Sequence, residues 1–202
     1  TAFNPFNEIP PIKLLKQIYK NNFFYILYFQ KIGFAEKELE KDIEKSLRLI
    51  YCNSDAFGMK KMIDLALKNN LNEKDKKSLF LEGMNEPKDL PSWLSNKDLK
   101  YFTKEFEKSG MFGPLNRYRC MDLDWKDLFK MSFDKIKKPS CFITGSLDPV
   151  NFFIPGVNLF DSVGGNYEDL RVKEQLNDIG HWTQQEAPDQ VNKILLDFLE
   201  KI

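Results

Sequence analysis

The sequence has 202 residues, enough for one domain with a sizeable core, and 42% of them are hydrophobic. Its 30 basic and 30 acidic residues are interspersed, which argues against a nucleic-acid or anionic-membrane surface as the main partner. Three cysteines without metal-ligand spacing indicate thiols in a reducing compartment, which makes the cytoplasm the default expectation. The longest aromatic-aliphatic run, residues 23–29, is too short to span a bilayer.

The first two thirds of the chain, residues 1–135, are expected to be mostly helical. Helices are predicted at residues 12–19, 35–51 and 95–108. The second of these has apolar residues at helical spacing. The third begins after Ser95, and the acidic residue three positions later can complete a capping box. Polar stretches at residues 69–77 and 82–89 are expected to be surface connections.

After residue 138 the pattern changes to strand, loop, strand, loop and helix. Residues 139–145 are apolar and β-favouring and end in glycine, so they predict a buried strand, and a second strand is expected near residues 171–176. The last helix has proline in its first turn and an apolar face. This alternation predicts the edge of a parallel sheet, which two strands alone cannot complete. We therefore predict an α/β protein with a partial sheet, in which residues 1–135 form a helical lid and residues 136–202 the C-terminal part of the core.

The only histidine, His181, lies 33 residues after Asp148, and each follows a predicted strand. An acid and then a histidine on such loops is the order of the last two members of an α/β-hydrolase triad. Taken alone, His181 could be structural and Asp148 could be an ordinary turn residue, but their combination favours a catalytic pair. Glu186 is an alternative acid, although it lies near a helix start, where acids are common caps.

The nucleophile of such a triad has no counterpart in this sequence. The nucleophile elbow requires glycine two residues before and two residues after the nucleophile, because the turn is too tight for side chains. No two of the ten glycines are four positions apart. We therefore expect the nucleophile to lie before Thr1, and the chain alone to be inactive and to need the missing N-terminal half.

Several segments together resemble the soluble epoxide hydrolases of the α/β-hydrolase superfamily. The similar segments are two lid motifs at residues 24–36 and 110–119, an acid loop at 148–150 and a histidine loop at 180–184. The run Gly-Pro-Leu-Asn-x-Tyr-Arg within the second lid motif is the most specific of them. The resemblance covers essentially the whole chain, in the order of the family.

The resemblance implies a reaction in which an aspartate attacks an epoxide carbon and forms an ester. It makes His181 the base that activates water against this ester and Asp148 the acid that orients the histidine. It makes Tyr25 and Tyr118 the hydrogen-bond donors to the epoxide oxygen, a role that suits phenols because they stay neutral at pH 7. The implied substrates are a small apolar epoxide and water, with no metal and no organic cofactor.

Two assignments leave alternatives open. Tyr28 lies three residues after Tyr25 and could supply the first donor instead. The family match also places Val150 and Trp182 at the wall of the substrate pocket, although both could serve packing alone.

Other functions remain compatible with the same predicted fold and acid–histidine pair. A haloalkane dehalogenase also forms an aspartyl ester, but it stabilises a halide with tryptophan or asparagine donors. An esterase has serine in the elbow. A non-catalytic fragment or an interaction module is the alternative outside catalysis. The two tyrosines favour the epoxide reaction.

Overall fold

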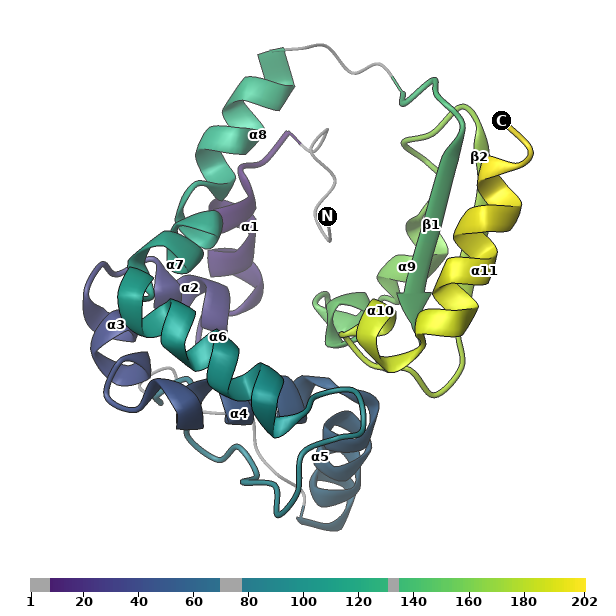
Figure 1. The fold of residues 1–202 in the computed structure, drawn as a ribbon. Helices are drawn as coiled ribbons and strands as arrows, with labels where there is room; N and C mark the ends of the chain where they lie inside the picture. The colour runs from purple at the N-terminus through teal and green to yellow at the C-terminus, as the bar shows by residue number, and fades with distance from the viewer. Residues whose placement is uncertain (1–7, 70–77, 131–134) are drawn as a thin grey trace. The chain divides into compact units, whose positions relative to one another are not determined.

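The computed structural model describes residues 8–69, 78–130 and 135–202, which fold as two compact units (Figure 1). The first, here called the histidine unit, comprises residues 51–68 and 135–202 of the described chain. The second, here called the helical unit, comprises residues 8–50, 69 and 78–130. The boundary between them falls within α4 (Ile43–Ser54).

The helical unit contains no strand among its described residues. Its helices are α1 (Pro11–Ile18), α2 (Tyr25–Phe29), α3 (Phe34–Leu39), the first part of α4, α6 (Asn96–Ser109), α7 (Phe112–Arg119) and α8 (Met121–Lys130). Pro11 occupies the first turn of α1, as expected from its fixed φ and missing N–H. Helix α1 packs against α8, and the Ile12 N–H donates to Asp122 Oδ1 at 2.9 Å. The helices are therefore joined by polar contacts as well as by apolar packing.

The single helix predicted at residues 35–51 is wrong, because the chain forms α3 and α4 with a break between them. Asp42 Oδ1 accepts from Lys45 N at 2.9 Å and so satisfies an N–H group at the start of α4. Glu40 Oε1 accepts from Met111 N at 2.7 Å, which links the break to another segment. The predicted apolar residues are buried on both sides of the break, since Leu39 in α3 and Leu47 in α4 are both buried.

Helix α6 confirms the predicted cap. Ser95 Oγ accepts from Asp98 N at 3.1 Å, and Asp98 Oδ2 accepts from Ser95 N at 3.2 Å. The helix ends before Gly110, whose φ of +67° suits glycine. Residues 82–89 form a loop as predicted, whereas the other predicted loop lies almost wholly outside the described residues.

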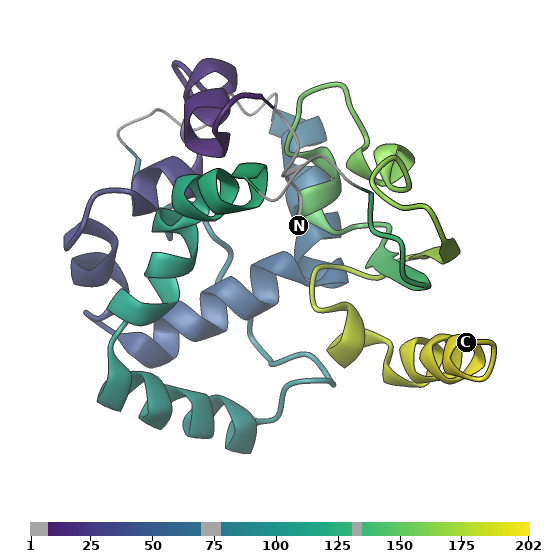
Figure 2. The same ribbon diagram turned by 90° about the horizontal axis from the view of Figure 1, so that it is seen from above.

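The histidine unit has the strand, loop, strand, loop and helix order predicted from the sequence. Its elements are α5 (Ala56–Asn69), β1 (Ser140–Gly145), η1 (Pro149–Phe152), α9 (Leu159–Ser162), β2 (Leu170–Leu176), α10 (Thr183–Glu186) and α11 (Pro188–Leu199). β1 and β2 pair in parallel, with Gly145 opposite Leu176. Figure 2 shows α10 leading directly into α11, which packs against β1. A small core of Leu176, Ala187 and Val191 joins the sheet to α11.

The first strand is less buried than the sequence predicts. Only Thr144 and Gly145 of β1 are buried, and the rest of the strand is partly exposed. Among the described residues, β2 is the only strand that pairs with β1, so one edge of β1 has no strand beside it. The apolar face of α11 is also incompletely covered, since the side chains of Leu195 and Leu199 are exposed.

No helix in the described part of the chain is long and apolar enough to cross a membrane. The two units group residues 51–68 with the C-terminal segment. The assignment of residues 1–135 to a lid and 136–202 to a hydrolase core stays a prediction.

Candidate active site

The loops after β1 and β2 bring together the two residues proposed as acid and base. His181 Nδ1 lies 2.9 Å from Asp148 Oδ1, although 33 residues separate them. Ser146 N donates to Leu176 O, and Leu147 N donates to Ile179 O, each at 2.9 Å. Parallel strands end at the same edge of a sheet, so these bonds join the two loops where the strands stop.

Two glycines allow the segments to approach this closely. A Cβ atom at Gly145 would lie 2.2 Å from Ile179 O and 2.4 Å from Gly180 O. A Cβ atom at Gly180 would lie 2.4 Å from the backbone nitrogen of Ala56. These contacts are with backbone atoms that cannot move aside, so both positions require glycine.

Asp148 is held so that its carboxylate faces the imidazole. Its side chain is 13% exposed, and Oδ1 also accepts from Val150 N at 2.9 Å. The Thr144 hydroxyl approaches Oδ2 at 3.4 Å. A carboxylate at Nδ1 favours the tautomer with a proton there, which leaves the Nε2 lone pair to accept a proton. The side chain of His181 is 38% exposed, as a base that meets water requires.

The C-terminal end of α4 supports the histidine loop. The backbone N–H of His181 donates to Ser54 O, and the Trp182 indole donates to Tyr51 O, both at 2.9 Å. The rings of Tyr51 and Trp182 meet edge to face at 4.8 Å between centroids. Sequence reasoning missed this support, because both acceptors are backbone carbonyls and carry no side-chain signal.

A hollow of about 330 Å³ opens beside the pair in the histidine unit. Its lining residues are Cys141, Ile143, Asp148, His181, Thr183, Gln184, Val191 and Leu195. Neither Val150 nor Trp182 belongs to this lining, so their expected place at a substrate wall stays a prediction. Burial raises the pKa of the Cys141 thiol, with a smaller contribution from Glu174, so this cysteine is protonated and a poor nucleophile at neutral pH.

The two expected oxygen donors lie together in the helical unit. Tyr25 begins α2, Tyr118 lies near the end of α7, and their rings meet edge to face at 5.5 Å. Burial raises the pKa of the Tyr118 phenol, while the charge of Arg117 and a hydrogen bond with Tyr25 act in the opposite direction. The Tyr118 hydroxyl therefore keeps its proton at neutral pH and can donate it.

The alternative donor, Tyr28, has a different partner. Its hydroxyl donates to Glu38 Oε2 at 2.7 Å. The same carboxylate accepts from Phe80 N at 3.1 Å and from Leu81 N at 2.9 Å. Burial, followed by the bond to Glu38, raises the pKa of Tyr28 far above its ordinary value. Tyr28 is thus bound within a local network, whereas Tyr25 faces Tyr118.

Polar side chains connect the helices that carry this tyrosine pair. Arg119 Nε donates to Phe29 O at 2.8 Å, and Arg119 Nη1 forms an ion pair with Glu36 Oε1 at 2.7 Å. Gln30 Nε2 donates to both Tyr118 O and Ile26 O, at 3.0 and 2.9 Å. The end of α2 and the end of α7 are therefore tied to each other beside the two rings.

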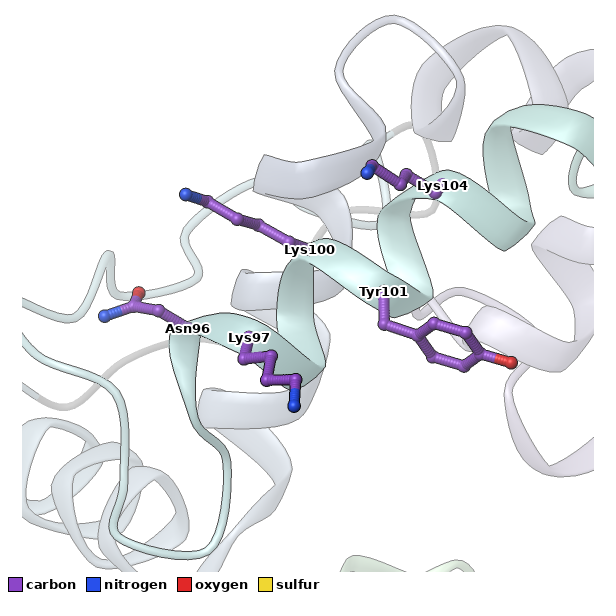
Figure 3. Close-up of a pocket in the computed structure, with 5 residues that line it drawn as sticks. All are labelled: Asn96, Lys97, Lys100, Tyr101 and Lys104. Atoms are coloured by element: carbon purple, nitrogen blue, oxygen red, sulfur yellow. The ribbon is translucent and has the colours of Figure 1, made fainter.

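A second hollow, on the surface of α6, lacks the features of a site (Figure 3). All its lining residues come from this one helix: Asn96, Lys97, Lys100, Tyr101 and Lys104. Figure 3 shows that their side chains diverge. Within the described ranges, no cluster of three or more histidine, cysteine or acidic side chains could hold a metal ion.

Comparison with known proteins identifies the family, although no family model matches the chain. Epoxide hydrolase A of Mycobacterium tuberculosis is 32% identical over 195 residues, which are 96% of this chain and 58% of that protein. The solved structure of an epoxide hydrolase from an endophytic Streptomyces superposes with a TM-score of 0.84 at 32% identity, over 98% of this chain and 58% of that one. The chain belongs to the epoxide hydrolase family of the α/β-hydrolases. The resemblance and the α/β class expected from the sequence are both confirmed.

A mammalian relative matches in the same way. Bifunctional epoxide hydrolase 2 of Rattus norvegicus is 30% identical over 199 residues, which are 97% of this chain and 32% of that longer protein. The chain thus spans less than two thirds of the length of these relatives and matches the C-terminal part of the family.

Proposed function

We propose that the complete protein hydrolyses epoxides to vicinal diols through an aspartyl-ester intermediate. The observation that carries this proposal is the contact between Tyr25 and Tyr118, because two phenols suit an oxygen that becomes an alkoxide. The His181–Asp148 pair supplies the base that the second step needs. Relatives named epoxide hydrolases support the assignment.

In the first step, an aspartate carboxylate attacks an epoxide carbon and the carbon–oxygen bond of the ring breaks. The electron pair of that bond stays on the epoxide oxygen, which accepts hydrogen bonds from both tyrosines and then a proton from one of them, leaving that tyrosine as its phenolate. Each such donor contributes about 2.7–4 kcal/mol to transition-state stabilisation in comparable oxyanion sites.

In the second step, His181 Nε2 takes a proton from water while the water oxygen adds to the ester carbonyl. The tetrahedral intermediate collapses, the bond to the diol oxygen breaks, and the imidazolium returns the proton to that oxygen. The aspartic acid that this leaves gives up its proton, and a proton returns to the phenolate left by the first step, so that both groups are restored for the next turnover. Asp148 keeps Nδ1 protonated and stabilises the imidazolium. Such general-base catalysis usually contributes about 10²–10⁴-fold.

The proposed nucleophile is an aspartate that precedes Thr1 in the complete protein. Two observations support this placement: no two glycines are four positions apart in the 202 residues, and the relatives are longer than the chain. The same missing half would cover the free edge of β1 and the exposed face of α11. The substrate would be a small apolar epoxide, with Val150 and Trp182 at its pocket wall and no cofactor.

The test is a comparison of three substrate classes on the complete protein and on residues 1–202 alone. We expect the complete protein to convert trans-stilbene oxide to its diol, without comparable release of halide from a haloalkane or of acid from an ester. The isolated chain should convert none of them. Serine in the elbow together with ester turnover would favour an esterase, and dominant halide release would favour a dehalogenase. Diol formation by the isolated chain would contradict the placement of the nucleophile.

A further inference from the structure

The side chain of Glu186 binds the backbone on both sides of the catalytic histidine. Its Oε2 accepts from Gly180 N at 3.0 Å, and its Oε1 accepts from Trp182 N at 3.0 Å. Oε2 also accepts from Ala56 N, the first residue of α5, at 2.8 Å. One carboxylate therefore holds three N–H groups, and two of them belong to the neighbours of His181.

These bonds complete a continuous set around the histidine. Gly180 N and Trp182 N donate to Glu186, and the N–H of His181 between them donates to Ser54 O at 2.9 Å. Three consecutive peptide groups thus have fixed partners, which leaves little freedom in the φ and ψ angles of His181. Those angles set the direction of its Cα–Cβ bond and hence the approach of the imidazole to Asp148.

We propose that Glu186 is a positioning residue for His181, which holds the histidine loop so that Nδ1 meets Asp148 and Nε2 meets the attacking water. This inference rests on the proposed function, because the histidine must act as a base for its position to affect turnover. Glu186 is not an alternative acid, since its oxygens bind backbone N–H groups while Asp148 contacts the imidazole.

Capping alone does not account for this arrangement. A residue that capped only α5 would need the bond to Ala56 N and no other. Here the carboxylate stands at the last residue of the four-residue helix α10 and reaches back across that helix to Trp182. Most of its bonds go to the histidine loop, so its loss should affect the step that uses histidine.

Glu186→Gln is the most informative variant, because it keeps the size of the side chain but leaves one acceptor oxygen. Its NH₂ group must then face an N–H donor, either that of Trp182 or those of Gly180 and Ala56. We expect ester hydrolysis in the complete enzyme to slow about tenfold in Glu186→Gln and about 10²-fold in Glu186→Ala, as misplaced catalytic groups do. The alkylation step should change by less than about twofold, since it does not use the histidine.

Two control variants distinguish an effect of Glu186 on the position of His181 from an effect of lost negative charge and from a general loss of stability. Asp189→Asn removes an exposed acid three residues later and should leave both steps unchanged. Ser95→Ala removes the cap of α6, in the helical unit, and lowers stability. If Ser95→Ala slows hydrolysis as much as Glu186→Gln at an equal loss of Tm, the effect is one of stability and the inference is overturned.

A spectroscopic measurement tests the inference apart from turnover. The Nδ1 proton of His181 can be observed by NMR in the complete protein labelled with ¹⁵N-histidine, and assigned by its loss in His181→Gln. We expect this signal to shift upfield or broaden in Glu186→Gln and to stay in place in Asp189→Asn. A shifted signal in a protein without epoxide turnover would refute the proposed function and support the positioning role. An unchanged signal and an unchanged rate of ester hydrolysis would overturn the positioning role.

Discussion

In each unit, a polar side chain forms hydrogen bonds to the backbone beside the functional residues. In the histidine unit these bonds are made at the starts of helices, and in the helical unit they are made at the ends of helices. In the histidine unit, the Glu186 carboxylate accepts from N–H groups at the starts of α5 and α10. In the helical unit, Arg119 and Gln30 donate to carbonyl groups in the last turns of α2 and α7. Helices leave N–H groups unpaired where they begin and C=O groups where they end, so an acid suits the first place and a cation or amide donor the second.

This difference affects how much stability each unit loses when the side chain that forms these backbone hydrogen bonds is replaced. In the histidine unit the acceptor can be shortened or neutralised without leaving a buried charge unpaired. In the helical unit, Arg119 also neutralises Glu36, and both side chains are about nine-tenths buried. Replacing a buried ion pair by apolar groups is often neutral, but removing one partner is costly. The helical unit should therefore be the more sensitive of the two to a single substitution.

The largest effect is expected from Arg119→Met. This change leaves the Glu36 carboxylate buried without its cation, so it should lower the free energy of unfolding by about 3–5 kcal/mol. The double variant Arg119→Met with Glu36→Leu should recover most of this loss. Chemical denaturation of both variants is the measurement, with Lys108→Met, an exposed lysine of α6, as the control. A loss below about 1 kcal/mol in Arg119→Met would contradict a structural role for the ion pair.

The tyrosine pair should show the next largest effect. Tyr118→Phe and Tyr25→Phe should each slow alkylation by about 10²–10³-fold in the complete enzyme, because each removes one donor to the forming alkoxide. Single-turnover kinetics measure this step, and circular dichroism checks that the fold is retained. Tyr28→Phe is the matched control and should leave alkylation nearly unchanged, since its hydroxyl is bound to Glu38. The opposite ranking of Tyr25 and Tyr28 would show that the first donor is misassigned.

The smallest effect concerns pH. The Arg119 guanidinium beside Glu36 holds the pKa of that carboxyl below its ordinary value of 4.5, against the opposing effect of burial. A group whose pKa is lower in the folded state adds stability above its unfolded pKa and loses it as pH falls through the folded pKa. The melting temperature should therefore fall more steeply below pH 4.5 in the wild type than in Glu36→Gln. Parallel curves for the two proteins would exclude this contribution.

The local parts of the fold followed from the sequence. The first helix, the Ser95 cap and the extent of α6 are set by neighbouring residues, so the sequence pattern was sufficient to predict them. The break before α4 was missed because the apolar spacing continues across it, although Asp42 caps α4 locally and Glu40 bonds to a residue 71 positions away. Periodicity reports which face of a helix is apolar, but it contains no information on such distant partners.

The site was predictable to a similar extent. His181 and Asp148 carried motif and spacing signals, and the structure brings them together. The support from Ser54 and Tyr51 depends on backbone carbonyls, which every residue has. Glu186 was visible as an acid after the histidine, but only the folded loop shows that its carboxylate binds the histidine's neighbours.

In the proposed mechanism, His181 activates water against an ester and is not needed to form that ester. Intact-protein mass spectrometry of a His181→Gln variant of the complete enzyme, incubated with an epoxide, tests this most directly. We expect a stable mass increase equal to one epoxide, and at most one equivalent of diol per enzyme. Asp148→Asn should show a milder form of the same block, because the imidazole stays but its tautomer is disturbed. Absence of any adduct, with substrate binding confirmed, would contradict the aspartyl-ester mechanism.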